Sequence, residues 1–190
     1  MQHHILDLKK FIPQDFCNKI ILYFDEELND AQIGVVEDSK KNAKVDKSTR
    51  NCQVKHLLGS DDTFGKKLIL NYLKLRILDS IEHYKINNPY LKISEISQID
   101  FLKYESNSYN SGYIFHVDHA AKAPERALSI SICLNNKFEG GEFIFNLQGK
   151  EHQIAQNVGD CVIFPSNFLY PHQVNKITYG TRYAIVAWVI

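Results

Sequence analysis

The C-terminal half of the chain is a series of short β-prone runs separated by turn signals. Gly140-Gly141, Asn157-Val158-Gly159-Asp160 and Thr178-Tyr179-Gly180-Thr181 have the composition of tight turns between strands. The runs cover 98–104, 112–118, 127–134, 142–146, 152–156, 160–164, 172–177 and 182–189. Eight short strands in one segment predict a jelly-roll, or double-stranded β-helix, barrel.

Before these runs, the sequence indicates a short strand and then a helix. Residues 1–12 read as a short strand that enters a turn. The following stretch, 13–28, has Phe16, Ile20 and Phe24 at helical spacing and Pro13 at its start. We therefore expect a first helix over 13–28.

A second helix is expected from Asp61 or Asp62 to about Tyr84. Asn87-Asn88-Pro89 would end it. Its apolar positions form a broad stripe, namely Phe64, Leu68, Leu70, Tyr72, Leu73, Leu75, Ile77, Leu78 and Ile81. The expected fold is therefore mainly β with α, with a jelly-roll core and N-terminal helices packed on one face. We expect a single domain, 1–190, in which 1–95 is mainly helical support and 96–190 is the catalytic core.

Two polar segments interrupt this pattern. Residues 29–56 are rich in charged side chains and lack apolar periodicity, which favours a long loop or a mobile flap. The stretch 105–111 also lacks apolar periodicity. Both 37–56 and 105–111 are therefore candidate lids, and a solvated linker is the alternative.

Composition excludes several classes of partner. The chain has 190 residues, with 22 basic and 22 acidic side chains, so nucleic acid and anionic membrane surfaces are not expected to bind it. It has no long apolar run and no recognisable secretory signal at its start. The four cysteines form no C-x-x-C pair, which favours reduced cysteines in a cytoplasmic protein.

His116-Val117-Asp118 is the first candidate for metal chemistry. Residues two apart on a strand point to the same face, so the imidazole and the carboxylate can meet one metal. His172 begins a later run and can converge with them inside a narrow barrel. Two histidines and one carboxylate form a facial triad that leaves coordination positions open, which is typical of non-haem Fe(II) oxygen chemistry.

Arg182 is the second candidate. Strand alternation places Arg182, Ala184, Val186 and Trp188 on one face of the last run. If that face lines the barrel, the buried arginine needs an anionic partner, and a dicarboxylate cosubstrate would supply one. Lys176 is a weaker alternative anchor for that carboxylate.

The combined pattern resembles the prolyl 4-hydroxylase-like branch of the Fe(II)/2-oxoglutarate oxygenases over about residues 98–190. The residues that support this resemblance are Tyr104, Tyr113, His116, Asp118, Arg126, Ser129, Leu134, Asn135, Gly140, Gly141, Glu142, Gly159, Asp160, Phe164, Pro165, His172, Val174, Gly180, Arg182, Tyr183 and Trp188. The opening stretch LDLKKFIPQDFCNKII is similar to the N-terminal strand and helix of that branch.

The resemblance implies roles for particular residues. His116, Asp118 and His172 would bind iron, and Arg182 would pair with the distal carboxylate of 2-oxoglutarate. Tyr104 would contact the cosubstrate near the metal, and Trp188 would shape the pocket.

Cys133 departs from the family pattern. It stands where some members have a tyrosine that helps to hold the same carboxylate. Ser129, Ser131 and Tyr113 are the candidates to replace that tyrosine, and we assign Ser131 to the cosubstrate site.

The expected activity follows from the resemblance. It is hydroxylation of an unactivated C–H bond by Fe(II), 2-oxoglutarate and O2, with succinate and CO2 as coproducts and ascorbate as a candidate reductant. A prolyl residue in a peptide or protein is the favoured substrate, with Arg50, Tyr109 and Tyr113 as candidate contacts. The alternatives are a free amino acid or small molecule as substrate, a cupin-type metalloenzyme that does not use 2-oxoglutarate, or a catalytically silent binding barrel. The oligomeric state stays open.

Overall fold

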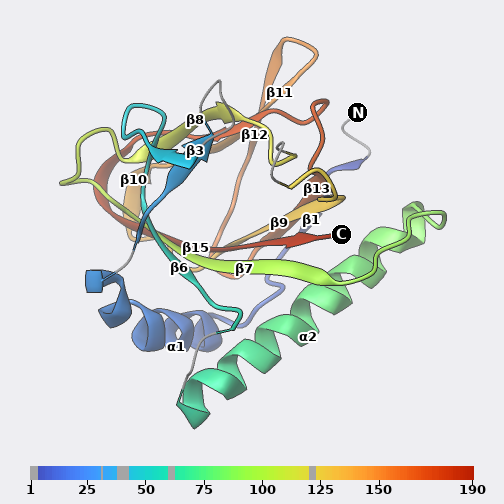
Figure 1. The fold of residues 1–190 in the computed structure, drawn as a ribbon, viewed down its shortest axis with the longest axis horizontal. Coiled ribbons are helices and arrows are strands. Elements are labelled where there is room, and N and C mark those ends of the chain that lie inside the picture. Colours follow the sequence, from blue (N-terminus) through green and yellow to red (C-terminus); the bar gives the residue numbers. More distant parts are fainter. Residues whose placement is uncertain (1–3, 31, 38–42, 60–62, 120–122) are drawn as a thin grey trace.

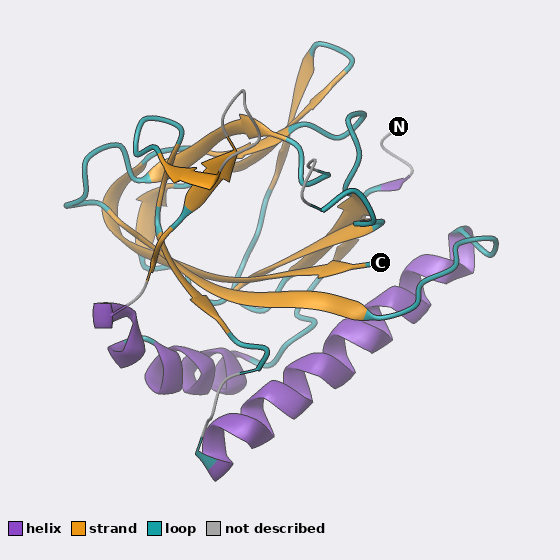
Figure 2. Ribbon diagram, viewed as in Figure 1, coloured by secondary structure: helices purple, strands orange, loops and turns teal. Residues whose placement is uncertain are grey.

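The computed structural model describes residues 4–190 except 31, 38–42, 60–62 and 120–122. Two helices and a short 3-10 helix accompany a set of antiparallel strands (Figures 1 and 2). The helices are α1 (Gln14–Phe24), η2 (Glu26–Asp30) and α2 (Phe64–Asn87). The strands are β1 (Leu6–Leu8), β2 (Gln32–Ile33), β3 (Val35–Glu37), β4 (Ala43–Val45), β5 (Arg50–Asn51), β6 (Gln53–His56), β7 (Ile96–Glu105), β8 (Gly112–His116), β9 (Leu128–Cys133), β10 (Phe138–Gly140), β11 (Phe143–Leu147), β12 (Lys150–Ile154), β13 (Cys161–Pro165), β14 (His172–Val174) and β15 (Ile177–Val189).

The strands form two facing sheets, which confirms the predicted jelly-roll fold. The larger sheet has the order β1-β13-β9-β15-β7-β6-β2, with β10 paired to β15. The smaller sheet has the order β12-β11-β14-β8-β5, and β3 and β4 form a separate hairpin. Both helices lie on the outer side of the larger sheet, as expected (Figure 1).

Alternation along the central strands divides the core in two. On β9, Leu128, Ile130 and Ile132 pack outward, in one cluster with buried residues of α1 and α2. Ser129 and Ser131 therefore face the interior of the barrel. That interior is filled by a second cluster, which includes Leu102, Tyr104, Phe143, Phe145, Phe164 and Val174.

Both helices lie near their predicted positions, although α1 ends at Phe24 and a 3-10 helix follows it. Helix α2 begins at Phe64, and the predicted caps Asp61 and Asp62 lie outside the described residues. This helix is apolar on two faces. It buries Leu73 and Ile77 against the sheet, while Phe64 and Leu75 are 78% and 65% exposed. The broad apolar stripe expected for this helix is therefore only half buried. No helix in the described part of the chain is both long and apolar enough to span a membrane.

The prediction of a loop or flap over 29–56 is wrong in part. This segment contains the short strands β2, β3, β4, β5 and β6. Strand β6 pairs with β7, and β5 pairs with β8, so both barrel sheets gain a strand from the N-terminal half. Residues 38–42 of the segment lie outside the described residues.

The turn expected at Thr178–Thr181 is also wrong, because these residues lie inside β15. Gly180 has φ +73°, and a Cβ at this position would overlap the Lys137 carbonyl oxygen next to β10. Its glycine therefore serves close strand packing within a long strand rather than a chain reversal. The strand β10 itself was not expected.

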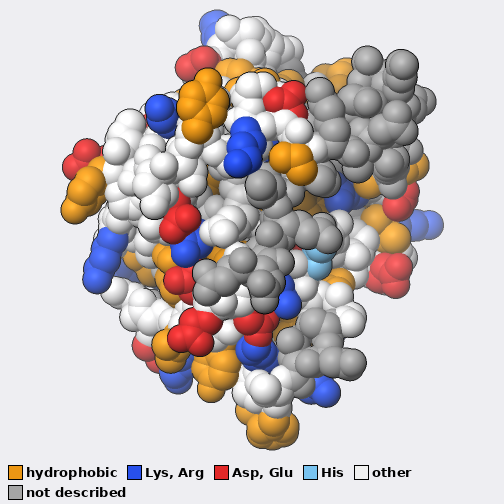
Figure 3. Space-filling model, turned by 60° about the vertical axis from the view of Figure 1, so that its left-hand side comes forward, with side chains coloured by type: hydrophobic (Ala, Val, Ile, Leu, Met, Phe, Trp, Pro, Cys, Tyr) orange, Lys and Arg blue, Asp and Glu red, His pale blue; other side chains and the backbone are white. Residues whose placement is uncertain are grey.

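Charged side chains of both signs are interspersed on the face drawn in Figure 3. This distribution agrees with the formal net charge of zero, and it shows no single-sign patch on that face.

Candidate metal centre

The structure brings His116, Asp118 and His172 together. His116 ends β8 and His172 begins β14, and the two residues face each other in the register of these paired strands. The His116 Nε2 atom lies 3.6 Å from Asp118 Oδ1, and the His172 Nε2 atom lies 3.6 Å from Asp118 Oδ2. One ligand atom from each residue lies within 4.8 Å of the other two, so a single ion could contact all three.

The predicted reason for this convergence is wrong for Asp118. Strand β8 ends at His116, and Asp118 follows in a bend. Strand alternation therefore does not orient its carboxylate. His119, the next residue, has an exposed side chain and is separate from the cluster.

Backbone carbonyls orient both imidazoles. The Nδ1 atom of His116 lies 2.8 Å from the Ile114 carbonyl oxygen, and that of His172 lies 3.1 Å from the Tyr170 carbonyl oxygen. A carbonyl oxygen only accepts, so each Nδ1 carries the proton and donates it. Both Nε2 lone pairs therefore remain available to a metal.

The protonation states suit metal binding. Burial lowers the pKa of His116 to about 3, with a further contribution from nearby His172, so His116 is neutral at physiological pH. Burial alone would raise the pKa of Asp118, but His172, His116 and a hydrogen bond from Ser129 lower it overall. The indole N–H of Trp188 also lowers the pKa of Asp118. Among the described residues it has no partner within the normal limits of a hydrogen bond. Asp118 is therefore ionised.

Aromatic rings fix the two histidines in place. The Tyr113 ring stacks on His116 with centroids 3.4 Å apart and planes 11° apart. Phe143, Phe145 and Phe164 have ring centroids 5.4, 5.8 and 4.7 Å from that of His172. The His172 side of the cluster is thus dry and closely packed.

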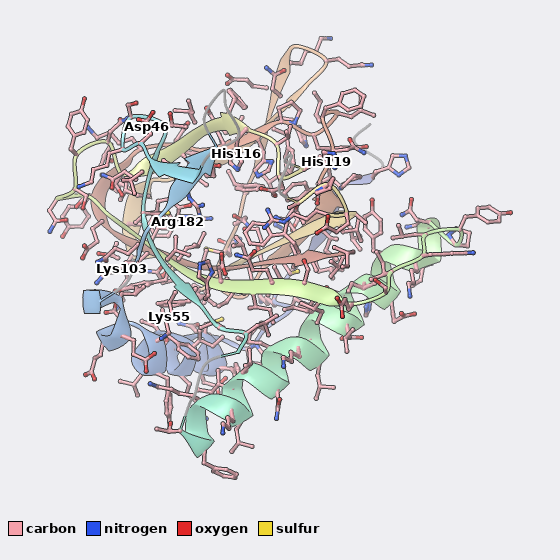
Figure 4. The ribbon with its side chains drawn as sticks, viewed as in Figure 1. Asp46, Lys55, Lys103, His116, His119 and Arg182 are labelled. Carbon is pink, nitrogen blue, oxygen red and sulfur yellow. The ribbon has the colours of Figure 1, made fainter. Side chains whose placement is uncertain are left out.

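Arg182 lies inside the barrel, as predicted (Figure 4), and is 2% exposed. Its Nη2 donates to Gln156 Oε1 at 3.2 Å. Gly141 leaves it room, since a Cβ there would lie 3.0 Å from the Arg182 Cδ atom. None of the ion pairs among the described residues includes Arg182, so its identified partner is a neutral amide. Lys55 and Lys103, by contrast, form ion pairs on the α1 side.

The remaining predicted cosubstrate residues lie on the same interior surface. Tyr104 faces Arg182 in the β7–β15 register, and Ser131 faces Val186 in the β9–β15 register. Gln156 Nε2 reaches the Ser131 carbonyl oxygen at 3.5 Å, so it connects the Ser131 backbone to Arg182. Burial raises the pKa of Cys133, while Arg182 opposes that rise, which places this thiol near the guanidinium.

The predicted substrate contacts divide into two groups. Arg50 on β5 faces Tyr113 on β8, with its guanidinium carbon 4.9 Å from the Tyr113 ring centre. Both residues therefore lie beside the three candidate metal ligands, because Tyr113 stacks on the ring of His116. Tyr109 is 79% exposed, and within the described part of the chain its backbone oxygen accepts a hydrogen bond from Asn51, so the structure does not bring its ring into the cluster.

Three residues near the site were missed or given another role by sequence reasoning. Ser129 donates to Asp118 Oδ2 at 2.6 Å, at the metal end rather than beside Arg182. Arg126 donates to the Asp118 carbonyl oxygen at 3.3 Å and stacks on Trp188 with its guanidinium carbon 4.0 Å from the ring. Alternation with Ser131 could have placed Ser129 on the interior face, whereas nothing local marks Gln156.

Comparison with known proteins gives a family match over the barrel. Residues 100–190 match the family described as the 2OG-Fe(II) oxygenase superfamily. A PKHD-type hydroxylase of Psychrobacter sp. is 40% identical over 87 residues, which are 41% of this chain and 33% of that protein. One from Prochlorococcus marinus is 31% identical over 121 residues, which are 62% of this chain and 54% of that protein. The chain thus spans about a third to a half of the length of these curated relatives.

Solved structures show the same fold. A prolyl hydroxylase from Trichoplax adhaerens, in complex with a hypoxia inducible factor peptide, superposes with a TM-score of 0.79 at 18% identity. That match covers 98% of this chain and 83% of the other. A prolyl-4-hydroxylase from Pseudomonas putida has a TM-score of 0.72 at 18% identity, covering 98% and 91% of the two chains. At this identity, both likenesses establish the double-stranded β-helix fold alone.

Proposed function

We propose, from the match of residues 100–190 to the 2OG-Fe(II) oxygenase superfamily, that the chain is an Fe(II)- and 2-oxoglutarate-dependent dioxygenase that hydroxylates an unactivated C–H bond. The observation that supports this most is the pairing of two features in one barrel. A largely enclosed cluster of two imidazoles and a carboxylate lies on the same interior surface as a buried arginine with a neutral partner.

The donor set fits Fe(II). Two histidine nitrogens and one carboxylate oxygen are the facial set of non-haem iron oxygenases, and they leave positions open for other ligands. The tautomers suit this role, because the carbonyls of Ile114 and Tyr170 accept hydrogen bonds from the Nδ1–H groups and leave both Nε2 atoms free to coordinate. His116, Asp118 and His172 would therefore hold the metal.

Arg182 fits the cosubstrate. A buried cation is costly unless an anion pairs with it, and the described neighbours of Arg182 supply a neutral amide. The distal carboxylate of 2-oxoglutarate would complete this site through paired N–H donors. Tyr104, Ser131 and Trp188 would border the same site, each being buried on the barrel interior.

In this reaction, one oxygen atom of O2 would enter the C–H bond as a hydroxyl group and the other would enter succinate, as 2-oxoglutarate loses CO2. Bound iron would supply the redox chemistry. The protein's own residues would do the rest. Arg182 orients the cosubstrate, while Phe143, Phe145 and Phe164 keep water away from His172. The stacked ring of Tyr113 holds His116 in place.

We further propose that the substrate is a prolyl residue in a peptide or protein. Two solved proteins of this fold are prolyl hydroxylases, and one of them was solved with a peptide. Arg50 and Tyr113 lie beside the cluster on the smaller sheet and are the proposed contacts, and the turn between β4 and β5 would close over the peptide. Tyr109 stays a weaker candidate, because it would have to move toward the site.

The test has two readouts. In the first, 2-oxoglutarate should raise the melting temperature of the protein only when metal is present, as mass-action linkage requires. In the second, Fe(II) and 2-oxoglutarate should give succinate in step with a peptide that gains the mass of one oxygen at proline. Oxidation of a free amino acid or small molecule alone would overturn the prolyl proposal. Cosubstrate binding without succinate, in the presence of every substrate offered, would favour a silent binding barrel.

A further inference from the structure

Asp118 is the predicted metal ligand that no strand holds. His116 and His172 are fixed by the pairing of β8 with β14, whereas Asp118 lies beyond the end of β8. The carboxylate of an aspartate can turn about its Cβ–Cγ bond, and it can offer a metal either one oxygen or both. Something else must therefore decide how this side chain binds.

Two buried serines form a short hydrogen-bond chain that ends on this carboxylate. Ser129, on β9, is 2% exposed, and its Oγ lies 2.6 Å from Asp118 Oδ2. Ser166, which directly follows β13, is 1% exposed, and its Oγ lies 2.8 Å from the Ser129 Oγ. An ionised carboxylate only accepts, so Ser129 donates its hydroxyl hydrogen to Asp118 and must accept a hydrogen bond from Ser166. The direction of both hydrogen bonds is thereby set.

The far end of this chain is itself anchored. The Ser166 backbone N–H donates to the Ala127 carbonyl oxygen at 3.1 Å, and its carbonyl oxygen accepts the His119 N–H at 2.9 Å. Ser166 therefore touches the Asp118 segment twice, through the backbone of His119 and through Ser129. The Arg126 contact to the Asp118 carbonyl oxygen adds a third tie.

The two carboxylate oxygens consequently have different surroundings. Oδ2 takes the Ser129 hydrogen bond and faces His172, whereas Oδ1 faces His116. Charge-assisted O–H···O⁻ bonds of this length are among the stronger ones in proteins, so the bond from Ser129 holds Oδ2 in place and competes with a metal for this oxygen.

We propose that Ser129, held by Ser166, is a positioning residue that keeps Asp118 bound to the metal through Oδ1 alone. This rests on the proposed metal role of the triad. A carboxylate bound through both oxygens would take one of the open positions that cosubstrate and O2 require. The serine pair would thus preserve the vacancy on which the proposed reaction depends.

The experiment measures metal binding rather than turnover. Mn(II) is titrated into metal-free wild type, Ser129→Ala, Ser129→Thr, Ser166→Ala and the control Ser80→Ala. Ser80 is also fully buried, but its hydroxyl donates to the Ile77 carbonyl oxygen within α2. Affinity is read by calorimetry, and the number of exchangeable waters on Mn(II) is read by water-proton relaxation.

Ser129→Ala should weaken Mn(II) binding by about 10- to 100-fold, the usual effect of losing such an outer hydrogen bond. It should also lower the water number by about one, as the freed Oδ2 takes an open position. Ser129→Thr keeps the hydroxyl and should restore both values, Ser166→Ala should shift both in the same direction by less, and Ser80→Ala should match wild type.

Wild-type affinity and water number in Ser129→Ala would overturn this inference alone. Mn(II) binding by wild type no tighter than by Asp118→Ala would overturn the metal role, and the inference with it. If Ser129→Ala does not fold, Ser166→Ala decides, since it leaves the Ser129 contact in place and removes only the donor behind it. Unchanged values in that variant would then count against the serine pair.

Discussion

Arg182 and Tyr104 occupy facing positions on β15 and β7, with the guanidinium carbon 5.6 Å from the centre of the phenol ring. Burial is the main cause that raises the pKa of Tyr104, so its hydroxyl stays neutral and cannot serve as the anion. The partner identified for Arg182, Gln156, is neutral as well. This corner of the barrel is therefore arranged for a negative charge that the described side chains do not provide.

The first prediction concerns that corner. Arg182→Ala should raise the apparent dissociation constant of 2-oxoglutarate by roughly two orders of magnitude or more, because leaving one partner of a buried ion pair without the other costs about 3–5 kcal/mol. The measurement is 2-oxoglutarate binding by calorimetry with Mn(II) present. Lys176→Ala is the control, since Lys176 is exposed. If Lys176→Ala weakens binding and Arg182→Ala does not, the anchor is misassigned.

The second prediction concerns the triad. Alanine at His116, Asp118 or His172 should abolish turnover and lower the iron content from about one ion per chain to none. The fold should survive, since each change removes a metal ligand rather than a large apolar side chain. Iron analysis, succinate assays and thermal melts check this. His119→Ala is the neighbouring control and should behave as wild type, and full activity in His172→Ala would contradict the assignment.

The third prediction concerns the turn between β4 and β5. Lys47 is exposed there, while Thr49 is tied to β8 through the Ile114 N–H. If this turn closes over a peptide, tryptic cleavage after Lys47 should slow when metal, 2-oxoglutarate and a proline-containing peptide are all present under argon. Mass spectrometry follows this cleavage against that at exposed Lys67 on α2. Protection by a free amino acid, with none from any peptide, would contradict a polypeptide substrate.

The fourth prediction concerns pH. The hydrogen bond between His56 Nδ1 and Asp100 Oδ1, 2.7 Å long, is the main cause that raises the pKa of His56 above 6.5. A raised pKa in the folded state stabilises the protein fully below about pH 6.5, and this contribution disappears as pH rises through the folded value. Since the His56 side chain is 54% exposed, the effect should stay under about 1 kcal/mol.

Two measurements check this pH effect. The urea midpoint of wild type should fall between about pH 6 and about pH 8 by more than that of His56→Gln. In an NMR titration, the His56 pKa should drop toward its ordinary value in Asp100→Asn. An unchanged titration in that variant would show that the carboxylate is not the cause.

Much of the fold could be predicted because its signals are local. The period of 3.6 marks α1 and α2, and short β-prone runs between turn residues mark most strands from β7 onward. The short strands β5 and β6 escaped prediction because two to four residues carry little periodicity. They become strands by pairing with β8 and β7, which lie tens of residues away in the chain.

The candidate site divides in the same way. The sequence by itself determined which residue types are available and roughly where they stand: two histidines, an aspartate and an arginine on β-prone runs, with alternation that turns Arg182 into the barrel. Only the tertiary structure decided which of these side chains contact one another. Asp118 reaches the cluster from a bend. Ser129 bonds to its carboxylate from β9, Ser166 bonds to Ser129 from the end of β13, and Gln156 meets Arg182 from a loop. The physical reason is that periodicity sets the face on which a side chain lies, whereas strand register and chain crossings set its neighbours, and these depend on contacts distant in sequence.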